Sequence, residues 1–367
     1  MSKLTSAFKQ VLIISPEPWN GHFVSKHHYA VTLAETSSQV YFLSPPDSSI
    51  LKPEIKPTKY RNLWEIKAPK VAKGLRFYPS FVKRSIEKQW LNKLERNIGS
   101  KFTTIWLFEN SRFYDLKFAQ DKLKIYHQVD LNQNFHEITA ASTADLVLCT
   151  TDYIKEVLEP HCKHIYKQHH AVACYNETKL SNKYTDLADN KINAAYIGNL
   201  KMSYLDVDLL TNVVKAFSHV TFHFVGTCNK NEPLYLACTG LDNVKWWGRV
   251  DSSEIPSILN SADVLLLTYQ AAHFHDQASP HKVMEYLASG KVTVATYTDE
   301  YKDKRELLEM VDKNSDYITK FDEVVNNLVQ YNSKENKSLR KSFANAHTYS
   351  KQLDKVISYL KTHKLIN

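Results

Sequence analysis

Long apolar runs, paired cysteines and glycine are all scarce in this chain of 367 residues. No apolar stretch reaches the roughly 18 residues that a transmembrane helix needs, so we expect none. The apolar run in the opening MSKLTSAFKQVLIISP is too short for a signal-peptide core and predicts a first buried strand instead. The five cysteines are odd in number and lack CxxC spacing, which argues against a disulfide framework and a structural zinc site. These absences predict a cytoplasmic protein.

Glycine accounts for only eight residues, roughly 2% against the usual ~7%. Gly198, Gly226 and Gly248 follow predicted strands in the C-terminal half, and Gly290 follows a predicted helix. Open α/β sheets bind ligands at the carboxyl ends of their strands. A glycine there either forms a tight turn or lets a ligand approach the backbone, and both interpretations stay open at any one position. Several glycines on one sheet edge favour a ligand.

Short β-branched or aromatic runs alternate with helical patterns along the chain, which predicts parallel sheets covered by helices. The pattern runs twice and is interrupted by the polar stretch 176–192, so we expect two Rossmann-like domains, at 1–180 and 191–340. A C-terminal helix, 341–367, is expected to pack back toward the first domain. The predicted strands are 10–15, 39–44, 104–108, 124–129, 145–150, 164–168, 193–198, 221–226, 244–248, 263–269, 291–296 and 316–319. The predicted helices are 24–36, 85–97, 113–121, 151–159, 205–218, 252–261, 281–289, 302–312, 321–331 and 337–362.

The segment SPHKVMEYLASGKVTV, residues 279–294, carries the clearest chemical signal. Pro280 lies at the start of a predicted short helix, whose free amides together with Lys282 suit a phosphate group. Glu285 lies about one turn deeper, where a carboxylate accepts two hydrogen bonds from vicinal hydroxyls such as those of a ribose. Phosphate donors followed by a diol acceptor predict a nucleotide site.

SPHKVMEYLASGK is similar to the SPxKxxEYxAxGxPVV segment of the GT-B glycosyltransferases, which use nucleotide-activated sugars. Three further stretches resemble the same class in order and spacing, and the likeness is most specific over about 190–296. Among these enzymes the chain is most similar to bacterial ones that build surface polysaccharides. The stretches are AAYIGNLKMSYLDVDLL, VKWWGRVDSSEIPSILNSADVLLLTY and SPEPWNGHFVSKHHYAVTLAETSSQVYFLSPP.

The resemblance implies a GT-B fold, with two Rossmann-like domains whose parallel sheets face a central cleft. It implies that the first domain binds the acceptor and that the second binds a nucleotide-sugar donor, without a cofactor or a metal. Glu285 would hold the ribose hydroxyls, and Lys282 and Ser279 would face the diphosphate. Arg249 either lies near the base or phosphates or is a surface arginine. The remaining expected donor contacts are Lys201, Gly198, Asn199 and His281.

Gln277 marks a departure from the retaining enzymes of this class, which carry an acid eight residues before the ribose glutamate. Asp276 lies beside it, and we keep both as catalytic candidates. Gln277 can hydrogen-bond a sugar hydroxyl, but it cannot stabilise developing positive charge as a carboxylate would. Inverting and retaining transfer therefore both stay open. His273, His275 and Asp276 could chelate a metal, although GT-B enzymes generally work without one.

Candidates for the acceptor side lie in the N-terminal half, at predicted strand ends and helix starts. Inverting transfer needs a general base, and Asp130 is our first choice, with Glu109 as another candidate. His27, in the pair His27-His28, is either a cleft residue or a structural one. His170 resembles part of a turn near the interdomain crossover and is expected, with Gly21, to line the cleft.

The net charge of +8 is concentrated in one segment. Residues 51–101 hold ten lysines and four arginines against four glutamates and no aspartate, a local net charge of +10. Aromatic side chains are interleaved, which suits the surface of an anionic membrane, and we expect residues 56–96 to bind the inner face of the cell membrane peripherally. A solvated face over core aromatics and a nucleic-acid surface remain the alternatives, the latter not expected.

Two other functions share the expected fold. One is a nucleotide-sugar epimerase, and the other is a non-catalytic module that binds a nucleotide sugar or polysaccharide. The first would have little use for a basic aromatic surface, whereas Gln277 in place of an acid favours the second.

Overall fold

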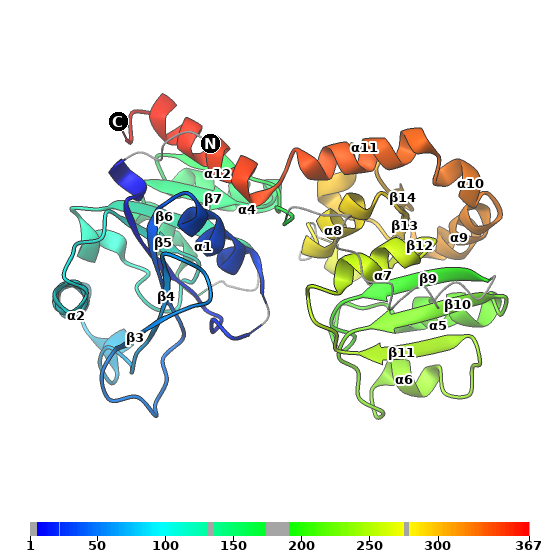
Figure 1. The fold of residues 1–367 in the computed structure, drawn as a ribbon, viewed down its shortest axis with the longest axis horizontal. Coiled ribbons are helices and arrows are strands. Elements are labelled where there is room, and N and C mark those ends of the chain that lie inside the picture. The colour runs from blue at the N-terminus through cyan, green and yellow to red at the C-terminus, as the bar shows by residue number, and fades with distance from the viewer. Residues whose placement is uncertain (1–5, 22, 131–134, 174–190, 275–278, 367) are drawn as a thin grey trace. The chain divides into compact units, whose positions relative to one another are not determined.

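The computed structural model describes residues 6–21, 23–130, 135–173, 191–274 and 279–366 (Figure 1). The chain divides into two compact units. The first domain comprises Met1–His169 with Tyr349–Asn367, and the second comprises His170–Thr348.

The first domain is built on a sheet whose described strands run in the order β3-β4-β2-β1-β5-β6-β7-β8. All neighbours pair in parallel except β3, which is antiparallel to β4. The strands are β1 (Gln10–Ile14), β2 (Gln39–Leu43), β3 (Glu54–Pro57), β4 (Leu63–Lys67), β5 (Thr104–Leu107), β6 (Leu123–Gln128), β7 (Leu146–Cys149) and β8 (Ile165–Lys167). The helices are α1 (Ser25–Glu35), α2 (Ser80–Ile98), α3 (Glu137–Thr143), α4 (Asp152–Leu158) and α12 (Tyr349–Thr362), with short 3-10 turns η1 (Ser6–Phe8), η2 (Leu75–Phe77), η3 (Leu116–Ala119) and η4 (Glu159–His161).

The second domain carries a parallel sheet in the order β11-β10-β9-β12-β13-β14. Chain order therefore reverses between β9 and β12, which is the switch point of a doubly wound fold. The strands are β9 (Ile192–Ile197), β10 (Val220–Val225), β11 (Val244–Gly248), β12 (Val264–Leu267), β13 (Val292–Ala295) and β14 (Glu309–Met310). The helices are α5 (Val207–Ala216), α6 (Pro233–Ala237), α7 (Ile255–Ser261), α8 (His281–Ser289), α9 (Tyr317–Asn326), α10 (Leu328–Tyr331) and α11 (Lys334–Asn345), with 3-10 turns η7 (Ala271–His273), η8 (Asp299–Tyr301) and η9 (Asn314–Asp316).

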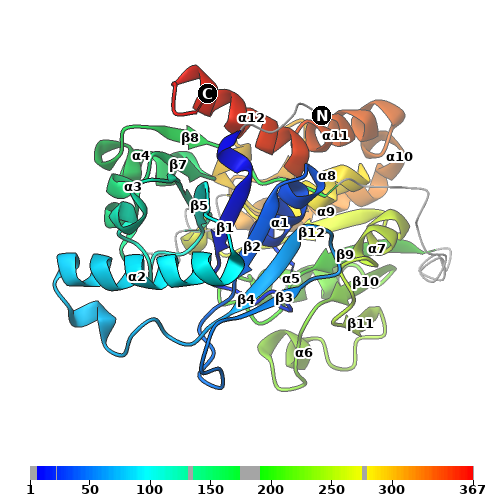
Figure 2. The ribbon, with the colours of Figure 1, turned by 60° about the vertical axis from the view of Figure 1, so that its left-hand side comes forward.

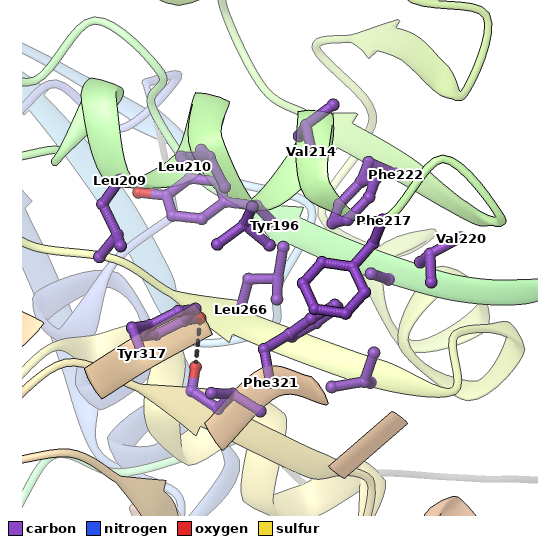
Figure 3. Packing of buried hydrophobic residues seen from close by; sticks show 14 of the residues in the cluster. Tyr196, Leu209, Leu210, Val214, Phe217, Val220, Phe222, Leu266, Tyr317 and Phe321 are labelled. Atoms are coloured by element: carbon purple, nitrogen blue, oxygen red, sulfur yellow. Dashed lines mark hydrogen bonds between the residues drawn. The ribbon is translucent and has the colours of Figure 1, made fainter. Parts of the chain in front are cut away.

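One buried layer of the second domain holds β9 in place (Figure 3). Phe321 of α9 packs edge-on against Phe217 at 4.9 Å between ring centroids and stacks on Phe222 of β10 at 5.9 Å. Tyr317 anchors the same helix, because its hydroxyl donates to the carbonyl of Val294 over 2.8 Å. Each large buried side chain of this kind contributes about 1.5–3 kcal/mol. The layer thus fixes the strand whose carboxyl end begins the candidate site.

The predicted α/β class is confirmed, and eleven of the twelve predicted strands lie within two residues of their observed bounds. Only four of the ten predicted helices do so, at 24–36, 151–159, 205–218 and 281–289. The strand predicted at 316–319 is wrong, since that stretch begins α9. The helix predicted at 302–312 is also wrong, because the chain there forms turns and the edge strand β14. Strands β3 and β4 were not predicted.

The helix predicted at 337–362 is interrupted between α11 and α12. Val172 accounts for the break: its amide donates to the carbonyl of His347 over 3.1 Å, and it forms a parallel bridge with Thr348. Beyond the break, α12 belongs to the first domain, where the side chain of Gln168 donates to the carbonyl of Gln352 over 2.8 Å. Nearly all of the predicted interdomain stretch 176–192 lies outside the described residues.

In the part of the chain that the structure describes, no helix has the length and apolarity to span a bilayer. The four described cysteines, Cys149, Cys162, Cys228 and Cys238, form no disulfide with one another.

Candidate functional site

The candidate site lies at the carboxyl edge of the second sheet, where chain order reverses. Gly198 follows β9, Tyr269 comes shortly after the adjacent β12, and α8 leads from this edge to β13. Doubly wound sheets bind their ligands at such a switch point because the loops from neighbouring strands diverge there. The topology therefore brings the strands that are followed by glycine together with α8, the motif helix, which lies within the SPHKVMEYLASGK motif.

One glycine at this edge, Gly226, is required by close backbone packing. Gly226 has φ +145°, and a Cβ added to it would lie 1.7 Å from the carbonyl oxygen of Gly198. The Gly198 amide donates to the carbonyl of Val225 over 2.9 Å, and the Gly226 amide donates to that of Gly248 over 2.8 Å. The tight-turn interpretation therefore holds for this pair, and approach of a ligand to the same backbone edge stays a prediction.

Helix α8 presents its N-terminus at this edge. Pro280 is the N-cap, and the helix ends at Gly290, whose φ of +76° is the left-handed cap that glycine favours. Ser279, just before the cap, is 9% exposed, and its hydroxyl has no hydrogen-bond partner among the residues that the structure describes. An unpartnered buried hydroxyl beside free helix amides is a ready donor set for an anion.

Lys282 extends from the first turn of α8 toward β9. Its Nζ lies 3.9 Å from the centroid of the Tyr196 ring and 5.5 Å from that of Tyr269. A Cβ on Gly198 would lie 2.6 Å from the same Nζ. Burial lowers the pKa of Lys282 to about 7, while Glu285 acts in the opposite direction. The site thus holds a poorly hydrated cation directly over the end of β9.

Glu285 lies one turn along the same half-buried helix face. Burial raises the pKa of its carboxyl to about 7, and Lys282 partly offsets this rise. Its neighbour Tyr286 is fully buried and accepts a hydrogen bond from the Ile197 amide over 2.9 Å, which ties α8 to β9. The helix therefore presents an acid and a base that are both short of solvation, an arrangement that a ligand with phosphate and diol groups would satisfy.

The other predicted donor contacts surround this pair less closely. Lys201 is exposed and forms an ion pair with Glu232 at 3.6 Å, so a diphosphate would have to compete for it. Asn199 is exposed and accepts a hydrogen bond from the Lys201 amide over 3.1 Å. Arg249 is exposed after β11, at the far edge of the sheet from α8, which fits the surface alternative better than a phosphate contact.

His281 and His170 meet at the start of α8, with ring centroids 5.3 Å apart in an edge-on arrangement. His170 is 6% exposed and belongs to the second domain. The two imidazoles therefore flank the N-terminal turn of the motif helix.

Comparison with known proteins now adds to this geometry. Residues 191–328 match the family described as glycosyl transferases group 1. This match lies within the second domain and covers less than half of the chain. TuaH of Bacillus subtilis (strain 168), provisionally named a teichuronic acid biosynthesis glycosyltransferase, is 24% identical over 168 residues, which cover 44% of this chain and 42% of TuaH. The matched region thus spans less than half the length of that relative.

Solved structures share the fold of the whole chain. Sucrose-phosphate synthase from Thermosynechococcus elongatus superposes with a TM-score of 0.70 at 11% identity, covering 97% of this chain and 100% of that one. The E. coli trehalose-6-phosphate structure bound with UDP-2-fluoro glucose superposes with a TM-score of 0.65 at 9% identity, covering 96% and 99%. The predicted GT-B fold is therefore confirmed, and the match to the glycosyl transferase family supports the same class for the second domain.

Asp130, the predicted base, follows β6 in the first domain. Its residue is open to solvent on one side, yet the surrounding protein dehydrates the carboxyl and raises its pKa, while Lys26 lowers it and Glu17 raises it. Lys26 is 3% exposed and forms an ion pair with Glu17. Charged groups from the ends of β1, α1 and β6 thus gather at the carboxyl edge of the first sheet.

His27 is a core residue rather than a cleft residue. It is fully buried on α1, its Nδ1 accepts from the Val24 amide over 3.2 Å, and its Nε2 lies 3.1 Å from the Pro18 carbonyl. The first contact requires an unprotonated Nδ1, so Nε2 carries the proton and donates it. Burial also lowers the pKa of this imidazole. The structural alternative for His27 therefore holds.

Gly21 and Glu109 form hydrogen bonds that hold together the loops at this edge of the sheet. The Gly21 amide donates to the Pro18 carbonyl over 3.0 Å in the turn after β1. Glu109, 5% exposed, accepts from Ser111 and Arg112, and Arg112 in turn donates to the Ser15 carbonyl over 2.6 Å. This network joins β5 to β1 at the switch point of the first sheet, and both carboxylate oxygens of Glu109 accept hydrogen bonds within it.

Gln277, Asp276 and His275 lie outside the described residues. Within the described ranges, no three histidine, cysteine or acidic side chains are grouped to hold a metal ion.

Two residues of the candidate site were not predicted from the sequence, Tyr196 in β9 and Tyr269 after β12. Their signal was an aromatic residue at or just after the carboxyl end of each switch-point strand. In the sequence such a residue is indistinguishable from an ordinary core aromatic.

Proposed function

We propose that this chain is a glycosyltransferase that moves a sugar from a nucleotide-diphosphate donor to a lipid-linked or saccharide acceptor in surface glycan biosynthesis. The observation that carries the proposal is the pairing of Lys282 and Glu285 on α8 beside the buried Ser279 hydroxyl. The UDP-2-fluoro glucose named for one structural neighbour and the teichuronic acid named for TuaH support the donor class and the glycan class.

The proposed donor contacts divide along α8. The Ser279 hydroxyl, the first-turn amides and the Lys282 ammonium would bind the diphosphate, and the Glu285 carboxylate would accept from both ribose hydroxyls. Lys201 would join the diphosphate after leaving Glu232. No cofactor or metal is needed for these contacts, and none is proposed.

A thermal-shift screen against nucleotide sugars tests the donor assignment, because a ligand that binds only the folded state raises the melting temperature. We expect at least one nucleotide sugar to raise Tm and Glu285→Ala to abolish that rise. A panel that leaves Tm unchanged would contradict the proposal. Transfer or donor hydrolysis in vitro separates a transferase from a binding module, and interconversion of free nucleotide sugars would identify an epimerase instead.

Asp130 is the proposed general base if transfer inverts the anomeric centre. A base works best when its pKa lies near the operating pH, and dehydration moves the Asp130 pKa in that direction. Asp130 would take the proton of the acceptor hydroxyl as that oxygen attacks the anomeric carbon and the nucleoside diphosphate leaves. Gln277 and Asp276 remain proposed contacts to the sugar.

The basic segment is proposed to bind an anionic membrane surface through the turn before α2, along the outside of the first domain (Figure 2). Phe77, Tyr78 and Phe81 are 77%, 47% and 73% exposed, and the Arg76 guanidinium lies 4.6 Å from the Phe77 ring centroid. Exposed aromatics beside cations suit a lipid headgroup layer. Part of the predicted set is core instead, because Leu91 is 1% exposed, Trp64 and Trp90 pack on the interior, and Lys83 is buried in an ion pair with Glu87.

Vesicle co-sedimentation tests the membrane proposal. We expect the chain to pellet with vesicles containing phosphatidylglycerol but not with pure phosphatidylcholine, and Phe77→Ser/Phe81→Ser to reduce the bound fraction. Leu51→Ser is the matched control, since Leu51 is an apolar side chain of the same segment that is 91% exposed. Equal pelleting with both vesicle types, or an equal loss with Leu51→Ser, would contradict this assignment.

A further inference from the structure

The Lys282 ammonium rests on aromatic rings rather than on a carboxylate. The Tyr196 ring centroid is 3.9 Å from Nζ and that of Tyr269 is 5.5 Å away, both within cation–π range. Glu285 favours the ammonium from one turn along α8, but in the described part of the chain the two do not form an ion pair. The charge of Lys282 is thus attracted without being neutralised.

Both rings are held firmly by their own domain. Tyr196 is fully buried in β9 within the layer shown in Figure 3. Tyr269 is 3% exposed, and its ring contacts Tyr204 edge-on at 4.9 Å. Its backbone amide donates to the Thr296 hydroxyl over 2.9 Å, and its carbonyl accepts from Asn314 over 2.9 Å. The two rings therefore form a fixed surface under a flexible side chain.

Gly198 provides the opening through which Lys282 reaches this surface. A Cβ there would lie 2.6 Å from Nζ and 3.1 Å from Cε of Lys282. The ammonium consequently lies against the main chain at the carboxyl end of β9, where a doubly wound sheet places its ligand.

We infer that Tyr196 and Tyr269 are positioning residues, which seat the Lys282 ammonium over Gly198 for the phosphates of a nucleoside diphosphate. The inference rests on the proposed donor site. A ring face attracts a cation without accepting its hydrogen bonds, so the N–H groups stay available for phosphate oxygens. A carboxylate in the same place would compete with the phosphate, and a bare apolar wall would favour the neutral amine.

Calorimetric titration with UDP, and in parallel with GDP, ADP, CDP and TDP, measures this effect. We expect Tyr196→Leu and Tyr269→Leu each to weaken binding of the best diphosphate by about 5- to 30-fold, the range of a dehydrated cation–π contact. Tyr196→Phe keeps the ring and should recover most of the loss. The two leucine variants are independent, so the test survives if one of them fails to fold.

A double-mutant cycle with Lys282→Met separates positioning from a general loss of packing. If the rings act through Lys282, adding Tyr196→Leu or Tyr269→Leu to Lys282→Met should cause little further loss. Tyr317→Leu is the matched control, because Tyr317 is an equally buried tyrosine of the same domain whose hydroxyl donates to the carbonyl of Val294 (Figure 3).

The outcomes are distinct. Weakened binding that phenylalanine rescues and that vanishes in the Lys282→Met background supports the inference. Three results would overturn the inference while leaving the donor site in place. The leucine variants could bind the diphosphate as tightly as the unmodified chain, their loss could persist in the Lys282→Met background, or Tyr317→Leu could show an equal loss. Absence of any diphosphate binding to the unmodified chain overturns the proposed function, and the inference with it.

Discussion

Glu285→Gln should make the ligand-free protein more stable while it removes donor binding. The pKa of Glu285 is raised from 4.5 to about 7 in the fold, so the native state binds a proton more tightly than the unfolded chain does. Stability from this group is therefore fully present below pH 4.5 and is lost as pH rises through 7. At pH 8 the wild-type carboxylate is ionised and poorly solvated, whereas the glutamine amide in its place carries no charge.

The size of the gain follows from the pKa shift. Each pKa unit corresponds to about 1.36 kcal/mol, so a rise from 4.5 to about 7 sets an upper bound of roughly 3 kcal/mol. The gain is smaller in practice, because Glu285 is only half-buried and water screens part of its charge. We expect about 1–2 kcal/mol, or a rise of roughly 2–8 °C in the Tm of the second domain.

Thermal unfolding at pH 8 and at pH 4.5, with and without the best nucleotide sugar, measures both effects. The Tm rise should appear at pH 8, shrink as pH falls through 7, and vanish near 4.5, where the wild-type group is protonated in the fold. Glu306→Gln is the control, an exposed carboxylate of the same domain that should not change Tm. A lower Tm of Glu285→Gln at pH 8 would refute the assignment of Glu285 as a poorly solvated carboxylate. A ligand-induced Tm rise in Glu285→Gln equal to that of the wild type would refute its assignment as the ribose acceptor.

Three further outcomes follow from the structure. The affinity for a nucleotide sugar should be highest near pH 7, because Glu285 must be ionised and Lys282 protonated, and both groups have a pKa of about 7. In calorimetric titrations, Lys282→Met should remove the fall in affinity above pH 7. A wild-type affinity that only rises or only falls across this pH range would contradict the prediction. Asp130→Asn should lower transfer by about 100-fold or more and leave the donor-induced Tm rise intact, as measured by product formation; unchanged turnover would exclude Asp130 as the base. Gly226→Ala should destabilise the second domain by more than about 2 kcal/mol, as measured by chemical denaturation, because its Cβ would lie 1.7 Å from the Gly198 carbonyl oxygen. Gly240→Ala is the control and should cost about 1 kcal/mol, because Gly240 has φ +80° but a Cβ there would meet no described atom within 4 Å.

The sequence by itself determined the features that depend on neighbouring residues. Helix α8 was predicted at its observed bounds, because Pro280 and Gly290 mark a helix start and end through their own backbone preferences. The two α/β series were predictable for the same reason, since the spacing of apolar side chains reports whether a segment is a strand or a helix. The order of Lys282 before Glu285 likewise predicted which end of α8 suits phosphate, a prediction that the proposed experiments test.

Only the tertiary structure decided which distant residues meet. Strand order is set by pairing between segments far apart in the chain, so the sequence alone did not place Gly198 and Tyr196 beneath Lys282. The same limit applied to His27, whose burial depends on Trp19, Phe23 and Phe42 packing around its ring. It applied to the basic segment as well, where folding buried Lys83 and Leu91 and exposed Phe77 and Phe81. A local pattern specifies an element and its faces, but the partner of each face is chosen by the packing of the whole domain.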